Sequence, residues 1–147
     1  MARRTRRSTR PARTPAPAVT STSPCPCGLA AAYGECCGRF HAGPAQAPTA
    51  ELLMRSRYSA FVVRDEAYLL RTWAPRTRPA DVDFDPAMHW TGLEIRQTAD
   101  GTAFHQHGMV TFEASYTHDG VAGSLHERSR FERHEGAWVY VDGDFID

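Results

Sequence analysis

The chain has 147 residues, 41% of them hydrophobic, which is enough for one modest core with small appendages. Its 17 basic residues are all Arg, which excludes enzymes that use a Schiff-base lysine and nucleotide-binding proteins that use a phosphate-loop lysine. No stretch reaches the roughly 20 consecutive apolar residues of a membrane helix, and no apolar secretory signal is found at the N-terminus. We therefore expect a cytoplasmic protein with no membrane contact.

Residues 1–23 form a basic arm rich in Arg, Thr, Ser, Pro and Ala. Six arginines precede the first acidic residue, and without them the chain has 11 basic against 17 acidic residues, a net charge of −6. This arm has too few apolar residues for their burial to offset the conformational entropy that the segment would lose on ordering. The composition therefore predicts a disordered tail. The arginines allow non-specific contact with RNA or ribosomal phosphates, although a solvated tail explains the same composition.

Four cysteines lie close together just after this arm. Cys25 and Cys27 are separated by one residue, and the adjacent Cys36 and Cys37 follow after eight more. Zinc binds four thiolates in a tetrahedron with bonds of about 2.3 Å, and a closed set of four is typical of a structural site. A peptide this short has little core, so the metal would supply its folding energy. We interpret residues 24–42 as a zinc knuckle.

Two disulfides or four free thiols are the alternative interpretations. Pairing Cys25 with Cys27, or Cys36 with Cys37, closes a very small, strained ring. A cross-pairing is geometrically allowed, but a reducing cytosol disfavours it. Redox activity is a further alternative, because clustered thiols with lowered pKa values are reactive.

Two helices are predicted after the knuckle. Thr49 is suited to cap a helix from Ala50 to Val63, and Asp65 to cap a second helix that continues through Trp73 and ends before Pro75. Four apolar residues of the first helix share one face: Met54, Tyr58, Phe61 and Val62. The two helices are expected to form a short hairpin-like pair.

Beyond residue 86 the pattern changes to an alternation of apolar and polar residues, which predicts strands with one covered face. The strand segments are Trp90–Thr98, Val110–Tyr116, Gly123–Arg133 and Trp138–Asp142. The turn pairs between them are Asp100-Gly101, Asp119-Gly120 and Glu135-Gly136. Helices followed by an antiparallel meander indicate an α+β fold, with the helix pair on the apolar face of the sheet.

The run from Cys25 to Gly38 resembles the SEC-C motif, a zinc module found at the C-terminus of the translocase ATPase SecA and in many bacterial proteins. The resemblance implies that the zinc ligands are Cys25, Cys27, Cys36 and Cys37. The Ser-Gly-Lys-Lys stretch of the motif is replaced by Leu29–Ala32, while Tyr33 is kept. The resemblance therefore implies zinc binding without the lysines that contact an acidic partner.

The resemblance extends along the chain to an uncharacterised bacterial family, the YchJ-like proteins. The matching segments are Cys36–His41, Ala47–Glu51, Met54–Phe61 and Leu125–Phe131. In this family a SEC-C motif precedes a nuclear transport factor 2-like domain, which implies a cone of helices and curved antiparallel sheet over residues 43–147. The implied order of elements agrees with the periodicity of the sequence. Such domains often dimerise through the sheet, so a homodimer is compatible with the family.

Alternation along the last two strands also predicts a pocket. Leu125, Glu127, Ser129 and Phe131 share one face, so Glu127 and Ser129 face the core if their apolar neighbours do. Trp138, Tyr140 and Asp142 share one face of the final strand in the same way. The candidate pocket residues are Arg57, Tyr58, Glu127, Ser129, Tyr140 and Asp142.

These residues allow two interpretations. In the functional one, Glu127 or Asp142 is a general base in the cone cavity, as buried carboxylates are enriched at functional sites. In the structural one, which we favour, Glu127 forms a buried ion pair with Arg57 or Arg55 that fixes the packing of helix on sheet. We assign no catalytic residue. The predicted function is a zinc-containing binding or adaptor module with a protein or ribosomal partner, and the alternative is a small-molecule-binding protein or enzyme.

Overall fold

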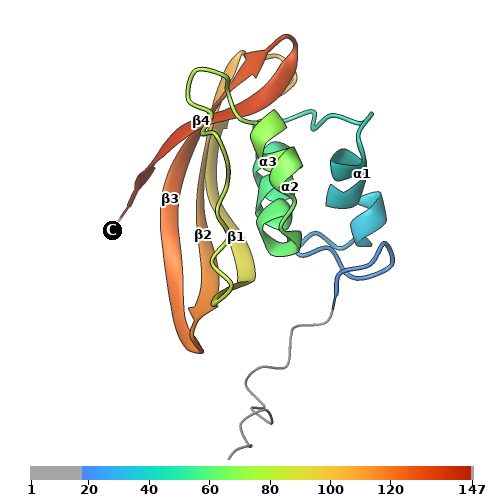
Figure 1. Cartoon of the computed structure of the whole chain (residues 1–147). Helices are drawn as coiled ribbons and strands as arrows, with labels where there is room; N and C mark the ends of the chain where they lie inside the picture. Colours follow the sequence, from blue (N-terminus) through green and yellow to red (C-terminus); the bar gives the residue numbers. More distant parts are fainter. Residues whose placement is uncertain (1–17, 147) are drawn as a thin grey trace, which may run out of the picture.

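The fold is described from a computed structural model, which describes residues 18–146. Most of the predicted disordered arm, residues 1–17, lies outside the described residues. The sheet forms one layer and α2 (Ala50–Val63) and α3 (Glu66–Arg71) lie against it, while α1 (Cys37–Ala42) lies beyond α2, away from the sheet (Figure 1). In the part of the chain that is described, no helix has the length and apolar character needed to cross a membrane.

Helix α2 has the predicted bounds, Ala50–Val63. Its N-terminus is capped by Thr49, whose hydroxyl accepts a hydrogen bond from the backbone N–H of Leu52 at 3.1 Å. It ends at Val63, and the following Arg64 adopts the left-handed conformation with φ 59°. The Thr49 cap, a local signal of the sequence, thus sets the start of this helix.

Helix α3 is shorter than predicted. Asp65 caps it as expected, accepting a hydrogen bond from the Tyr68 N–H at 3.0 Å, but the helix ends at Arg71. Trp73, which we expected inside the helix, instead forms a parallel bridge with Tyr140. Backbone bonds to the edge strand replace the last helical turn at this point: Ala74 N–H donates to Tyr140 and Tyr140 N–H to Thr72, each at 2.8 Å.

The sheet is an antiparallel meander in the order β1-β2-β3-β4. Its strands are β1 (Met88–Asp100), β2 (His107–His118), β3 (Val121–His134) and β4 (Ala137–Phe145). The residues that end the first three strands or follow them, Asp100, Asp119 and Glu135, all have positive φ and precede glycines that do too. The predicted α+β fold and strand order are thus confirmed, as are the two-residue turns at Asp119-Gly120 and Glu135-Gly136. Asp100-Gly101 instead leads into a longer loop, residues 101–106, between β1 and β2.

One extra residue in β4 changes which side chains face the core. Phe131 pairs with Tyr140 and Arg130 pairs with Asp142, so Val141 has no partner of its own and forms a bulge. The bulge reverses the alternation beyond it, and Gly143 takes the inward position. The expectation that Asp142 shares the inward face of Tyr140 is therefore wrong.

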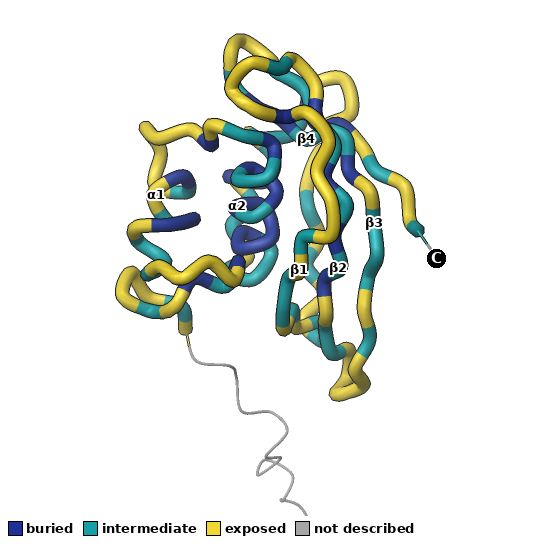
Figure 2. The backbone as a smooth tube through the Cα atoms, turned by 180° about the vertical axis from the view of Figure 1, so that it is seen from behind, coloured by how far each residue is buried: buried dark blue, intermediate teal, exposed yellow. Residues whose placement is uncertain are grey.

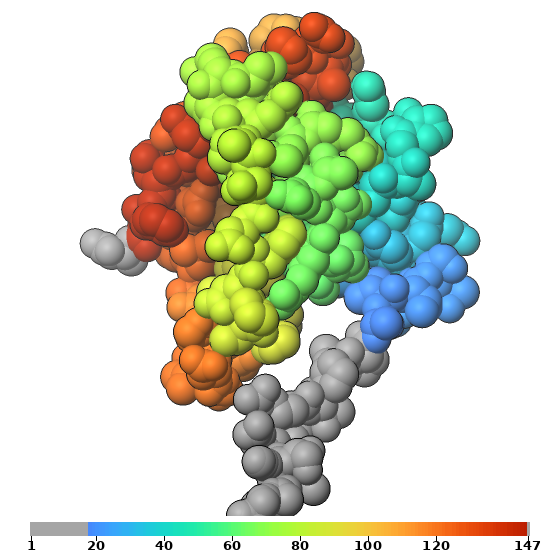
Figure 3. All heavy atoms as spheres, viewed as in Figure 1, coloured from blue at the N-terminus to red at the C-terminus, as the bar shows by residue number. Residues whose placement is uncertain are grey.

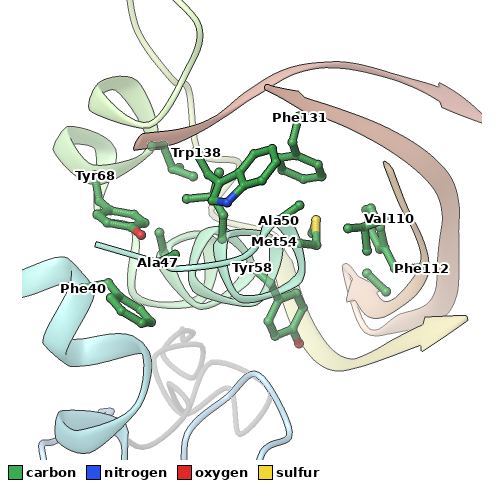
Figure 4. Packing of buried hydrophobic residues seen from close by; sticks show 14 residues of the cluster. Phe40, Ala47, Ala50, Met54, Tyr58, Tyr68, Val110, Phe112, Phe131 and Trp138 are labelled. Carbon is green, nitrogen blue, oxygen red and sulfur yellow. The ribbon is translucent and has the colours of Figure 1, made fainter. Parts of the chain in front are cut away.

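The core lies between α2 and the sheet. Buried stretches of the chain occur in α2 and in the strands (Figure 2). The buried side chains between them include Tyr58, Tyr68, Val110, Phe112, Phe131 and Trp138 (Figure 4). The segment between α3 and β1 covers the front of the molecule beside α2 (Figure 3), where the ring of Phe84 packs against Phe61 at 6.1 Å between centroids. Part of the apolar face is thus covered by a loop.

Two short helices and an ordered loop near the cysteines were not predicted. The 3₁₀ helix η3 (Tyr33–Glu35) and α1 follow a turn whose flanks pair Pro24 with Ala32. Ser23 and Ser21, which we placed in the disordered tail, accept hydrogen bonds from Tyr33 and Gly34 at 2.8 and 2.9 Å. The end of the arm is therefore ordered by backbone bonds to the knuckle.

Replacing Thr49 by Ala is expected to lower the free energy of unfolding by about 1 kcal/mol, because the Leu52 N–H loses its cap. Urea denaturation measures this loss. Thr49→Ser is the matched control, since it keeps the hydroxyl and should retain most of the stability. Equal stability of Thr49→Ala and the wild type would contradict the capping role.

Candidate functional site

The sulfur atoms of the four cysteines form a compact cluster. All four Sγ atoms lie within 4.8 Å of one another, and no cysteine is more than 6% exposed. The Sγ atoms of Cys27 and Cys36 are 3.7 Å apart, close to the edge of about 3.8 Å in a tetrahedron with 2.3 Å bonds. A disulfide would need about 2.05 Å. The four free thiols therefore match a tetrahedral metal site.

The local chain path brings the two cysteine pairs together. The Cys25 N–H donates to the Ala31 carbonyl at 3.0 Å, which closes the turn that carries Cys25 and Cys27. Cys36 is held by its N–H bond to the Tyr33 carbonyl at 3.0 Å, and α1 begins at the next residue. Gly38 must lack a side chain, because a Cβ there would meet the Tyr33 carbonyl oxygen at 2.7 Å. Backbone geometry thus presets the cluster.

The cluster is electrostatically unsuited to holding four thiolates without a cation. Burial raises the pKa of Cys36 to about 12. The pKa of Cys37 is also raised, chiefly because its thiol donates hydrogen bonds to Cys25 and Cys27. Hydrogen bonds from the Cys27 and Cys37 thiols stabilise the Cys25 thiolate and lower its pKa. A divalent cation would offset the mutual repulsion of further thiolates, as metal-bound cysteines are deprotonated.

The knuckle is fastened to α2 by polar contacts. Arg55 donates to the Cys27 carbonyl at 2.8 Å and forms an ion pair with Glu51 at 3.0 Å. The Ser59 hydroxyl lies 3.7 Å from the Cys25 Sγ. Sequence reasoning missed this role of Arg55 and Ser59, because nothing in the local pattern shows which residues of a helix meet a distant loop.

His41 forms a second link between knuckle and α2. Its Nε2–H donates to the Ser56 carbonyl at 2.8 Å, so Nδ1 is the acceptor for the Tyr33 hydroxyl at 2.6 Å. Burial lowers the pKa of His41, which favours this neutral form. The ring also packs against Tyr68, with 4.5 Å between centroids. His41 was overlooked because a lone histidine carries no spacing signal.

A pocket of about 160 Å³ lies between α2 and the sheet. It contains five of the six predicted pocket residues: Arg57, Tyr58, Glu127, Ser129 and Tyr140. The sixth, Asp142, lies on the outer face, where it accepts from Arg130 at 2.6 Å. The bulge at Val141 explains this correction. Lining residues that were not predicted include Trp73 and Trp90.

The predicted ion pair of Glu127 with Arg57 or Arg55 is not formed. Arg57 instead donates from Nη1 to the Leu69 carbonyl at 2.8 Å and to the Thr72 hydroxyl at 2.7 Å. Its guanidinium carbon lies 4.8 Å from the ring centroid of Trp73 and 4.7 Å from that of Tyr140. Burial lowers the pKa of Arg57 to about 10. Aromatic faces and neutral acceptors therefore replace the expected carboxylate.

Glu127 is held in place from its own strand and from β4. Its Oε2 accepts hydrogen bonds from the Ser129 hydroxyl at 3.0 Å and the Tyr140 hydroxyl at 3.5 Å. Any side chain at Gly143 would overlap this carboxylate, so the glycine leaves the room that it occupies. Burial and the nearby Glu127 raise the pKa of Tyr140 to about 12, which keeps its hydroxyl a proton donor.

A comparison with known families matches the part of the chain that forms α2, α3 and the sheet. The family model for the YchJ middle, nuclear transport factor 2-like domain matches residues 49–143. The chain belongs to the YchJ family. YchJ relatives include a UPF0225 protein of Streptomyces avermitilis, 66% identical over 145 residues, which cover 99% of this chain and 97% of the relative. A UPF0225 protein of Ralstonia nicotianae is 49% identical and covers 87% of this chain and 95% of its own length.

Solved structures resemble this YchJ-family chain across both knuckle and cone. A SEC-C motif containing protein from Rhodopseudomonas palustris superposes with a TM-score of 0.74 at 31% identity, covering 84% of this chain and 98% of that one. A SEC-C motif containing protein from Psychrobacter arcticus gives 0.71 at 26%, covering 86% and 85%. The resemblance to the SEC-C motif and the YchJ-like family is therefore confirmed.

Replacing Tyr33 by Phe is expected to destabilise the protein by about 1–3 kcal/mol, because the buried Nδ1 of His41 loses its donor. Urea unfolding measures the effect. Tyr116→Phe is the matched control, since no hydrogen bond of its hydroxyl is found within residues 18–146. If both variants lost the same small amount, the link through His41 would not support the knuckle.

Proposed function

We propose that the protein is a zinc-containing binding module in which one zinc ion, held by Cys25, Cys27, Cys36 and Cys37, has a structural role. The observation that carries the proposal is the cluster of four buried Sγ atoms within 4.8 Å of one another. An all-cysteine donor set favours zinc among the common divalent metals, because soft thiolates select it.

The structural role is supported by the donor count and by the neighbours of the cluster. Four protein ligands complete a tetrahedron and leave no position for water or substrate. Arg55 and Ser59 link the cluster to α2, so an ion there would fix the knuckle on the helix that forms one wall of the pocket. Chemistry at the metal is not part of the proposal.

The purified wild type is expected to contain about one zinc per chain, and Cys36→Ser well below half of that, because three ligands remain. Plasma emission spectrometry on samples purified without chelators measures the content. Ser115→Ala, on an exposed strand position, is the control and should keep its zinc. A wild-type content below about half an equivalent would contradict the proposal.

Loss of the metal is also expected to lower the melting temperature of Cys36→Ser by roughly 5 °C or more, since about 1 kcal/mol corresponds to a few degrees in a domain of this size. Circular dichroism at rising temperature measures this shift. An unchanged melting temperature in a zinc-free variant would rule out the structural role.

The partner of such a module is proposed from charge and composition. The replacement of the motif's lysines by Leu29–Ala32 leaves the knuckle without a basic patch of its own, while the Arg-rich arm keeps six positive charges. We place the protein in the cytoplasm, where thiols stay reduced. We propose that the module binds a protein or ribosomal partner and that its arm contacts RNA non-specifically. We also propose that two chains form a homodimer through the sheet.

A chain lacking residues 1–17 is expected to bind a mixed-sequence RNA at least tenfold more weakly than the full chain at low salt, because phosphate contacts by arginine dominate such binding. Fluorescence anisotropy at two salt concentrations measures the difference. Replacing the six arginines of the full chain by Gln is the matched control for length, and it should weaken binding equally. Equal affinity of all three chains would refute RNA contact through the arm.

The second candidate function is binding of a small molecule in the pocket, with or without chemistry by Glu127 as a general base. The observation that favours it is that Arg57 and Glu127 both line the pocket without forming an ion pair with each other. An ion pair between Arg57 and Glu127 would have supported a purely structural role for both residues. Separated, they leave two opposite charges on the wall of a largely aromatic pocket.

A further inference from the structure

Arg57 carries a buried positive charge that lacks a carboxylate partner. Arg57 is only 4% exposed. Its two acceptors in the protein, the Leu69 carbonyl and the Thr72 hydroxyl, both receive their hydrogen bonds from Nη1. A guanidinium has five N–H groups, and the three N–H groups on Nε and Nη2 have no acceptor within residues 18–146. Glu127 favours the charged guanidinium from a distance but forms no ion pair with it, and a buried charge without a directly bound counterion is costly. Arg57 lines the pocket, so a bound anion can reach it.

The neighbouring indole adds to the surplus of donors. Trp73 also lines the pocket, and among the described residues its Nε1 is a fully buried nitrogen without a hydrogen-bond partner. Buried donors are nearly always paired in native proteins. Because the Trp73 nitrogen is fully buried, it does not face the pocket. The donors that a ligand can reach on this side are the free N–H groups of Arg57, which call for a ligand with acceptor atoms.

Glu127 offers the complementary group. Oε2 accepts the Ser129 and Tyr140 hydroxyls, whereas Oε1 has no donor within the described part of the chain. The two hydroxyls and the space left by Gly143 fix the carboxylate. One oxygen of a preset carboxylate is thus free for a donor of a ligand.

Tyr140 keeps the two charges apart. Its ring lies against the Arg57 guanidinium at 4.7 Å, and its hydroxyl points to Glu127 at 3.5 Å. Tyr140 faces inward before the bulge at Val141. The bulge turns Asp142 outward to Arg130, so the Asp142 carboxylate does not reach Arg57. A ligand with a negative group and a donor group can join the two ends.

The remainder of the pocket wall is apolar. It is formed by Met54, Phe61, Trp90, Phe112, Ala114 and Leu125, together with the ring of Tyr58. A volume of about 160 Å³ is close to that of cavities that hold benzene. The apolar body of a ligand is therefore limited to about the size of a branched aliphatic or single aromatic group.

We propose that this pocket binds a small carboxylic acid that has an apolar side chain and a hydrogen-bond donor next to its carboxylate, namely an apolar amino acid or the matching 2-hydroxy acid. The carboxylate is bound by Arg57 and the ammonium or hydroxyl by Glu127, while the side chain contacts the aromatic wall. This inference rests on the second candidate function and is independent of the zinc site.

Four probes related by single groups test the inference on the full chain: L-leucine, L-2-hydroxy-4-methylpentanoate, 4-methylpentanoate without the donor, and 3-methylbutylamine without the carboxylate. Chemical shifts of the tryptophan indole N–H groups are followed during titration into the millimolar range. We expect saturable shifts with leucine or the hydroxy acid, and at least tenfold weaker binding of the other two probes. Whichever of leucine and the hydroxy acid binds more tightly shows whether the pocket prefers an ammonium or a hydroxyl donor.

Variants of β3 place the binding in the pocket. Glu127→Gln keeps the size of the side chain and is expected to weaken leucine binding at least tenfold, and Leu125→Trp, which fills the pocket, to abolish it. Glu132→Gln is the matched control, since Glu132 lies on the outer face of the same strand and pairs with Arg76. Its affinity should equal that of the wild type.

The outcomes separate this inference from the zinc proposal. Absence of saturable shifts with any probe, or equal binding of 4-methylpentanoate or 3-methylbutylamine, would overturn it, as would unchanged affinity in Glu127→Gln and Leu125→Trp. Zinc content and unfolding temperature are measured on the same samples, so a variant that fails to fold is recognised. A full zinc content with no ligand binding would refute the pocket inference alone.

Discussion

The burial of α2 on two opposite sides is the constraint on which the rest of the structure depends. Eight of its fourteen residues are buried, because the sheet covers one side and the cysteine knuckle the other (Figure 2). A helix in this position has no solvent-facing stripe of the usual width. Small residues, Ser56, Ser59 and Ala60, are each 0% exposed and allow the knuckle to approach closely.

This position connects the two candidate sites through one short stretch of helix. Ser59 contacts Cys25, the Ser56 carbonyl accepts from His41, and Arg57 between them enters the pocket. An ion bound by the cysteines would therefore fix the rotation of α2 and with it the position of the Arg57 guanidinium.

The polar groups of the pocket follow from a second constraint, the bulge in β4. Tyr140 faces inward before the bulge, and because Val141 is an extra residue, Asp142 beyond it faces outward and Gly143 inward. The inward glycine makes room for Glu127, and the outward aspartate pairs with Arg130 on the outer face. A single inserted residue thus selects one carboxylate for the pocket and removes another.

The sequence by itself determined the local features: the bounds of α2 from the Thr49 cap, the strand order from alternation and turn pairs, and the cysteine cluster from its spacing. These signals act within a few residues, so a pattern is enough to show them. Tertiary structure alone decided the early end of α3, the outward turn of Asp142 and the aromatic surroundings of Arg57. Each depends on a partner far along the chain: Tyr140 for Trp73, Arg130 for Asp142, and Trp73 with Tyr140 for Arg57. Contacts between residues so far apart in the chain produce no periodic pattern in the sequence, so they could not be predicted from it.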